Sequence, residues 1–164
     1  MPLTQAISER EIFDALRSAA GEAGVVTDPA DVRAAALDGR GRRQGEALAV
    51  VRPASTEEVS RVLKVAARYG LAVIAQGGNT SNVGGATPEP GAPESLSRRT
   101  LILQLGRMKR ILKLDAVNNT IALEAGVVLQ DAQKAASDAG RLLALSLAAE
   151  GSCQIGGVIA ANAG

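Results

Sequence analysis

The sequence contains no histidine and no tryptophan, and its only aromatic residues are Phe13 and Tyr69. Without histidine, these 164 residues cannot form a Ser/His/Asp triad, a Cys/His pair or a histidine metal site. A nucleic-acid surface built from stacked aromatic side chains is excluded as well. We therefore expect no metal centre here, and any general acid or base would be Asp, Glu, Lys, Tyr or Cys.

The charge balance and the cysteine content exclude further classes of partner and site. The 18 Lys and Arg residues against 17 Asp and Glu leave a net charge of +1, which gives no basic excess for a nucleic-acid partner. The single cysteine, Cys153, excludes an internal disulfide. Residues 1–24 lack the apolar core of a secretory signal, and no apolar run reaches the roughly 18 residues of a membrane helix. These absences predict a globular protein in the cytoplasm with no membrane span.

Helix and strand patterns alternate in the first half of the chain. Apolar residues at helical spacing predict a helix over Thr4–Ala20, and Asp28-Pro29 predicts the start of another. The apolar runs 47–51 and 71–75 are typical of buried strands. Between them, a capping box at Ser55-Thr56-Glu57-Glu58 and the C-terminal Gly70 delimit a helix. This order predicts a right-handed βαβ unit.

The second half predicts shorter strands and one helix. Residues 101–105, 110–114 and 120–125 have strand patterns, and Asn118-Asn119 predicts the turn between the last two. A helix is expected over 128–139. The fold class is therefore α+β, with a parallel βαβ layer followed by a smaller, mainly antiparallel sheet.

A glycine-rich loop, Gln76 to Gly85, follows the second buried strand. Glycines allow backbone amides to converge on one concavity, and such a nest binds phosphate oxygens. The hydroxyls of Thr80 and Ser81 would add two donors. The loop lacks the Lys-Ser/Thr of a Walker A motif and the spacing of a dinucleotide fingerprint. A glycine-rich surface turn remains the alternative.

Two further glycine clusters carry weaker signals. Gly151 to Gly157 permits close backbone approach, either to a large flat ligand or to a tightly packed core. Cys153 within it is more typical of a small buried apolar residue than of a reactive thiol. Gly39-Arg40-Gly41 begins like a dinucleotide motif, but Gln44 takes the third glycine position and a strand follows, which favours a solvated loop.

Three segments, taken in order, resemble one family. They are similar to the FAD-binding (PCMH-type) domain of the vanillyl-alcohol oxidase superfamily. The segments are residues 50–59, residues 76–88, and residues 145–157 with 162–164. The version here resembles the branch that holds D-2-hydroxyglutarate dehydrogenase, D-lactate dehydrogenase and the glycolate oxidase flavin subunit. Three motifs in the right order make this resemblance far more specific than a single glycine loop.

The resemblance implies a non-covalent FAD, with the first loop around its pyrophosphate and Gly78 facing that group. It also implies a D-2-hydroxy acid substrate whose hydride passes to the flavin while a base takes the hydroxyl proton. Relatives with covalent flavin often use a histidine where this chain has Asn79, or a cysteine near Cys153, so a cysteinyl flavin is a minor alternative. The implied cofactor-binding residues are Gln76, Gly77, Gly78, Asn79, Thr80, Ser81, Gly84, Gly85, Leu145, Gly151, Ser152, Ile155, Gly156, Gly157, Asn162 and Gly164.

The same resemblance predicts a truncated protein. Residues 1–46 would form a helical lead-in and residues 47–164 an incomplete FAD-binding domain, with FAD between its two layers. The substrate domain, which would bind the 2-hydroxy acid and supply the catalytic residues, would be absent, so no catalytic residue is expected here. A homodimer is one open assembly state.

Two alternatives remain at this point. The chain could be a non-catalytic remnant or subunit that binds FAD, another nucleotide or a partner chain. It could also belong to another enzyme of the superfamily, similar to UDP-N-acetylenolpyruvoylglucosamine reductase or alditol oxidase. The DNA downstream of codon 164 separates the first alternative from a dehydrogenase, because only a dehydrogenase requires an open frame for a substrate domain.

Overall fold

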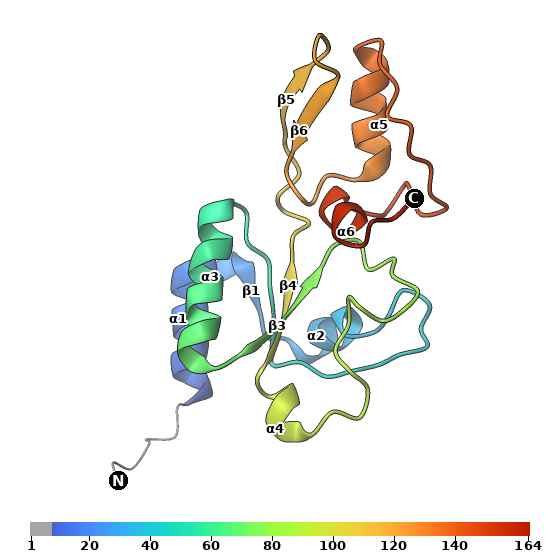
Figure 1. The fold of residues 1–164 in the computed structure, drawn as a ribbon. Coiled ribbons are helices and arrows are strands. Elements are labelled where there is room, and N and C mark those ends of the chain that lie inside the picture. The colour runs from blue at the N-terminus through green and yellow to red at the C-terminus, as the bar shows by residue number, and fades with distance from the viewer. Residues whose placement is uncertain (1–7) are drawn as a thin grey trace.

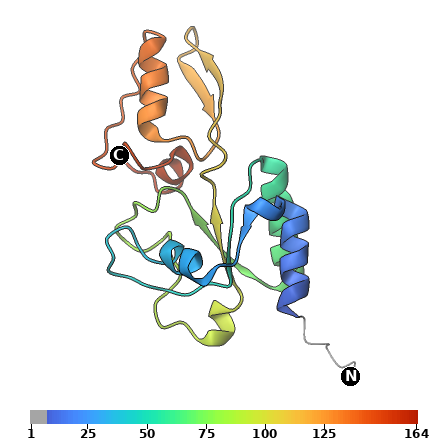
Figure 2. The same cartoon turned by 180° about the vertical axis from the view of Figure 1, so that it is seen from behind.

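The computed structural model describes residues 8–164 and divides them into two halves (Figures 1 and 2). The sheet half, residues 8–104, has a four-stranded sheet with helices on both faces. The hairpin half, residues 111–164, has a two-stranded antiparallel sheet beside two helices. The expected α+β class, with a parallel layer and a smaller antiparallel sheet, is confirmed. No helix within residues 8–164 is both long and apolar enough to cross a membrane.

The four-stranded sheet has the order β1-β2-β4-β3. Strand β1 runs antiparallel to β2, whereas β2 and β3 both run parallel to β4. Strand β4 therefore lies between the two strands of the predicted βαβ unit, which are not neighbours. The strand bounds are β1 Val25–Val26, β2 Ala49–Val51, β3 Ala72–Gln76 and β4 Thr100–Gln104.

Helices cover both faces of this sheet (Figures 1 and 2). Helices α1 (Glu9–Ala20) and α3 (Thr56–Tyr69) pack on one face, and α2 (Pro29–Ala35) packs on the other. Of the helix predicted from residue 4, residues 4–7 lie outside the described part of the chain. A short 3-10 turn, η1 (Glu22–Gly24), follows α1.

The caps of these helices follow their sequence signals. Asp28 caps α2 and Ser55 caps α3, each through a side-chain oxygen that accepts backbone N–H groups. In a capping box the Glu58 side chain would accept from the backbone N–H of Ser55. Here its Oε2 accepts from the N–H of Ala54, one residue earlier. Gly70 ends α3 in the left-handed conformation that glycine adopts without strain.

The core of the sheet half follows the two-residue period of its central strands. Val51, Leu101 and Leu103 lie with α1 and α3, whereas Val50 and Ile102 lie with α2. Because successive side chains point to opposite faces of a strand, continuous apolar runs are needed to bury both faces. This explains why β2 and β4 have no polar alternation.

The hairpin half begins with β5 (Ile111–Asp115) and β6 (Thr120–Leu123), joined through a turn in which Asn119 has a left-handed φ of 53°. Helix α5 (Leu129–Asp138) follows, close to its predicted bounds. Two short helices were not expected from the sequence: α4 (Glu94–Ser97), before β4, and α6 (Ile155–Ala160), within the second glycine cluster. A small core of Leu129, Cys153 and Val158 joins α5 to α6.

A buried carboxylate ties down the base of the hairpin. Glu124 is 8% exposed, and its Oε1 accepts from Arg110 Nε at 2.9 Å and Nη2 at 2.7 Å. Its Oε2 accepts from the backbone N–H of Arg110 at 2.7 Å. These bonds to the guanidinium and to the N–H hold the pKa of Glu124 below its ordinary value of 4.5. Glu124 thus has a structural role at the base of the hairpin.

Glu124→Gln keeps the shape of the side chain but removes the charge that Arg110 binds. A depressed pKa stabilises the fold above the unfolded pKa, and that contribution is lost as the pH falls through the folded value. We expect the variant to melt below the wild type at pH 7 and the difference to shrink as the pH falls below the ordinary value of 4.5. Melting temperatures between pH 3 and 8 test this. Glu94→Gln, which breaks the exposed pair with Arg98, is the control and should change little.

Candidate functional site

The first glycine loop leaves the carboxyl end of β3 with its amides free. Among residues 8–164, no acceptor takes the backbone N–H of any residue from Gly77 to Asn82, and Val83 N–H reaches only Ser81 Oγ at 3.3 Å. These six consecutive N–H groups, at the end of a parallel strand, are left without a partner and are available to an anion. The carboxyl end of a parallel strand is also where α/β sheets bind their ligands.

Two amide side chains of this loop point into the protein instead. Gln76 is 1% exposed, and its Nε2 donates to the carbonyls of Ala35 at 2.9 Å and Ala86 at 2.7 Å. Asn79 has a left-handed φ of 54°, and its Nδ2 donates to the carbonyl of Leu37 at 2.7 Å. Both side chains are therefore used to fix the loop, which leaves its backbone amides for a ligand.

The second glycine cluster is held by backbone hydrogen bonds to the segment between β6 and α5. Gly156 N–H donates to the carbonyl of Ala125 at 2.8 Å, and Ile155 N–H donates to that of Val127 at 2.8 Å. A Cβ on Gly156 would lie 2.7 Å from the Cβ of Ala125, so only glycine fits without displacement. Close packing, the alternative reading of this cluster, thus accounts for Gly156.

The two glycine segments meet at Gly78. A Cβ there would overlap the backbone carbonyl of Ser152, and one on Gly77 would lie 3.3 Å from the side chain of Gln154. The sequence predicts both segments in one site, and the structure brings these parts of them into contact. However, Gly78 faces the carbonyl of Ser152 rather than open space. This corrects the expectation that a side chain at this position would occupy the space of the pyrophosphate, because it would first collide with the protein itself.

The remaining predicted residues lie in the two glycine segments, before the second of them, or after α6. The backbone faces of Gly85 and Gly157 are open, with no atom within 4 Å of a Cβ built there. Leu145 packs in the α5–α6 core and lies near Gly164. Asn162, with a φ of 47°, follows the end of α6. Thr80, Ser81, Gly84 and Gly151 lie in the two loops and are not fully buried.

Sequence reasoning missed two residues at the site. Gln154 lies between Gly77 and Gly106, and its Oε1 is buried without a hydrogen-bond partner in the described residues. Arg43 packs against Gly84 and pairs with Glu89 at 3.0 Å. Gln154 lies within the second glycine cluster and Arg43 within the glycine-containing loop after α2, but the sequence alone assigns neither side chain to this site, so the three-dimensional arrangement identifies them.

The junction suits a phosphate-bearing flavin cofactor. Its free N–H groups can receive phosphate oxygens, its two open glycine faces admit a ligand close to the backbone, and Gln154 Oε1 is an acceptor that lacks a donor. The residues present therefore fit the cofactor that the glycine loop suggests.

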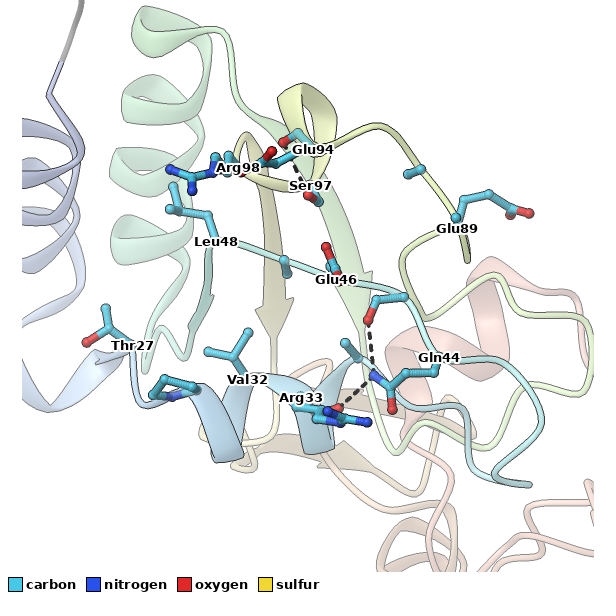
Figure 3. A pocket seen from close by; sticks show the side chains of 16 residues that line it. Thr27, Val32, Arg33, Gln44, Glu46, Leu48, Glu89, Glu94, Ser97 and Arg98 are labelled. Atoms are coloured by element: carbon cyan, nitrogen blue, oxygen red, sulfur yellow. Dashed lines mark hydrogen bonds and ion pairs between the residues drawn. The ribbon is translucent and has the colours of Figure 1, made fainter.

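A separate cavity of about 620 Å³ lies elsewhere in the sheet half (Figure 3). Helix α2, the segment before β2 and the segment that includes α4 surround it. Its side chains carry both charges, including Arg33 and Arg98 with Glu46, Glu89 and Glu94, and Gln44 Nε2 donates to the carbonyls of Arg33 and Gly45. It lies at the amino ends of β2 and β4 and contains no residue predicted for the cofactor site.

Residues 47–164 match the family described as FAD binding domain. The chain therefore belongs to this family of FAD-binding domains, as the three ordered motifs predicted. The fold of this chain is also similar to that of a solved alkyldihydroxyacetonephosphate synthase, with a TM-score of 0.79 and 21% sequence identity. The match covers 98% of this chain and 30% of the synthase chain.

Its homologues include D-2-hydroxyglutarate dehydrogenases. A rice protein (Oryza sativa subsp. indica) named as a probable mitochondrial D-2-hydroxyglutarate dehydrogenase is 38% identical over 148 residues, which is 90% of this chain and 25% of that protein. The mitochondrial D-2-hydroxyglutarate dehydrogenase of Bos taurus is 34% identical over 140 residues, which is 85% of this chain and 24% of that protein. The chain thus spans about a quarter of the length of these curated relatives.

The prediction of a cytoplasmic location is wrong. Both relatives are named as mitochondrial proteins. The lack of an apolar signal segment in residues 1–24 therefore does not support a cytoplasmic location.

Gly78→Ala should destabilise the protein even without a cofactor. The added Cβ overlaps the carbonyl of Ser152, and forced overpacking of this kind costs about 1–3 kcal/mol of unfolding free energy. Gly85→Ala is the matched control, because its Cβ meets nothing within 4 Å, and it should change stability by less than about 0.5 kcal/mol. Chemical denaturation of the flavin-free variants measures both values. Equal stability of the two would contradict the close contact at Gly78.

Proposed function

We propose that this chain is the FAD-binding part of a flavin-dependent dehydrogenase that oxidises a D-2-hydroxy acid. The observation that carries the proposal is the run of free N–H groups from Gly77 to Asn82 beside the second glycine segment. The activities named for the rice and bovine relatives support the substrate class. Gly77 to Ser81 would hold the pyrophosphate through backbone amides, and Gly157 would let the cofactor approach α6.

FAD, when bound, supplies an acceptor for the hydride of the substrate. The contribution of this chain is to bind and orient that cofactor. The side chains at the junction are amides, hydroxyls and one buried thiol, and none of them is a base suited to neutral pH. Proton transfer and recognition of the substrate carboxylate would therefore be performed by groups outside this junction.

The test compares FAD with riboflavin, which lacks the phosphates. We expect FAD added to the flavin-free protein to bind at least about 100-fold more tightly than riboflavin, because the loop amides form charge-assisted hydrogen bonds. Quenching of flavin fluorescence measures both affinities. Equal affinities would contradict phosphate binding by the loop, and no binding of FAD would contradict the proposed cofactor site.

The substrate class is tested on the whole protein that contains this sequence. Under anaerobic conditions, D-2-hydroxyglutarate or D-lactate should bleach the absorbance of the bound flavin, while the L-enantiomers should not. A flavoprotein that none of these acids reduces would support the non-catalytic alternative instead.

We further propose that the flavin is not covalently attached. Cys153 is 5% exposed, and burial raises the pKa of its thiol, so the reactive thiolate is scarce at neutral pH. The side chain of Asn79, the other position considered for covalent attachment, is an amide and is not a nucleophile. Acid precipitation should therefore release all the flavin into the supernatant, which absorbance measures. Yellow colour that stays with the precipitated protein would contradict this.

A further inference from the structure

The end of α2 lies against the first glycine loop and receives hydrogen bonds from it. Gln76 Nε2 donates to the carbonyl of Ala35 at 2.9 Å, and Asn79 Nδ2 donates to the carbonyl of Leu37 at 2.7 Å. The carbonyl of Ala36, between them, accepts from Gly45 N–H at 3.1 Å. The last carbonyls of a helix have no partner within the helix. Here two amide side chains of the loop and one backbone N–H supply the missing donors.

Gln76 also connects the two ends of the loop. It stands at the start of the loop, and its Nε2 also donates to the carbonyl of Ala86 at the other end, at 2.7 Å. Its Oε1 accepts from Gln104 Nε2 at 2.6 Å, and Gln104 Oε1 accepts from Arg52 Nε at 2.7 Å. One buried amide thus joins α2, both ends of the loop and the carboxyl end of β4.

The turn after α2 closes around the same loop. Asp38 is 6% exposed, and its Oδ1 accepts from the backbone N–H groups of Arg42 at 2.6 Å and Arg43 at 2.9 Å. Within this turn a Cβ on Gly39 would overlap the carbonyl of Asn79, so the two backbones touch. Residues 39–42 are exposed, as the composition of this loop suggested, and the turn touches the glycine loop through the backbone of Gly39.

We propose that residues 28–45 form one wall of the cofactor cradle, by which we mean the proposed FAD site at the first glycine loop. These residues lie outside the matched domain of residues 47–164. Gln76 and Asn79 are then positioning residues that anchor the loop to this wall. Their side chains act on the backbone of residues 77–82 and do not touch the cofactor. This inference rests on the proposed function, because it assigns these residues to the binding of FAD.

The test removes each anchor without adding charge. Gln76→Met keeps length and volume but has no N–H donor, and Asn79→Gly keeps the left-handed backbone but has no side chain. We expect each to raise the dissociation constant for FAD about tenfold, because buried carbonyls lose their donors. We also expect faster amide hydrogen exchange of residues 36–45 in the flavin-free protein.

Asn119→Gly is the matched control. Asn119 is exposed and has the same left-handed backbone as Asn79, in the hairpin turn. This variant should change neither FAD affinity nor the exchange of residues 36–45. Asn79 is only half-buried, so its variant keeps the test valid if Gln76→Met fails to fold.

The exchange measurement separates the two proposals. Weaker FAD binding by Asn79→Gly with unchanged exchange of residues 36–45 would mean that Asn79 contacts the cofactor itself, which overturns the positioning role. Wild-type affinity in both variants overturns it too. If the wild type binds no FAD, the proposed function fails, whereas the exchange of the flavin-free protein still decides whether the anchors hold the loop.

Discussion

Backbone atoms, rather than interlocking side chains, bring the two glycine segments together. Gly78 meets the carbonyl of Ser152, Gly156 packs on Ala125, and a Cβ on Gly126 would overlap the carbonyl of Leu105. At Gly78 no side chain can rotate to adjust the spacing between the segments, although the side chain of Gln154 lies beside it against Gly77. The relative position of the sheet half and the hairpin half therefore depends on residues that have no Cβ, and so does the shape of the cradle between them.

Uncharged groups stabilise the cradle once the halves are in place. The anchors on α2 are amide side chains and carbonyls, and they leave the loop N–H groups without partners. A loop that used its own N–H groups for folding could not offer them to a phosphate. The side chains of the loop thus stabilise its conformation while its backbone N–H groups stay available to a ligand. This explains how a sequence with few reactive side chains forms a binding site.

Local signals in the sequence predicted most of the fold. The caps Asp28 and Ser55, the left-handed Gly70 and the apolar runs of β2 and β3 lie where expected, because each acts within a few residues. Strand order was not predicted, because the insertion of β4 between β2 and β3 is a long-range choice. Helix α6 was missed since its glycines lower helix propensity, and packing against residues 125–127 overrides it. For the same reason the sequence could place both glycine segments in one site but could not identify Gln154 or the wall formed by residues 28–45.

The contact of Gly78 with Ser152 joins segments that are far apart in the sequence, so it belongs to the folded chain and not to the unfolded one. A ligand held at this junction binds the native state and not the unfolded chain, and by mass action it shifts the folding equilibrium. At 100 times its dissociation constant, FAD would add about 2.7 kcal/mol to the free energy of unfolding. Cellular supply of the flavin would then govern the abundance of the protein as well as its activity.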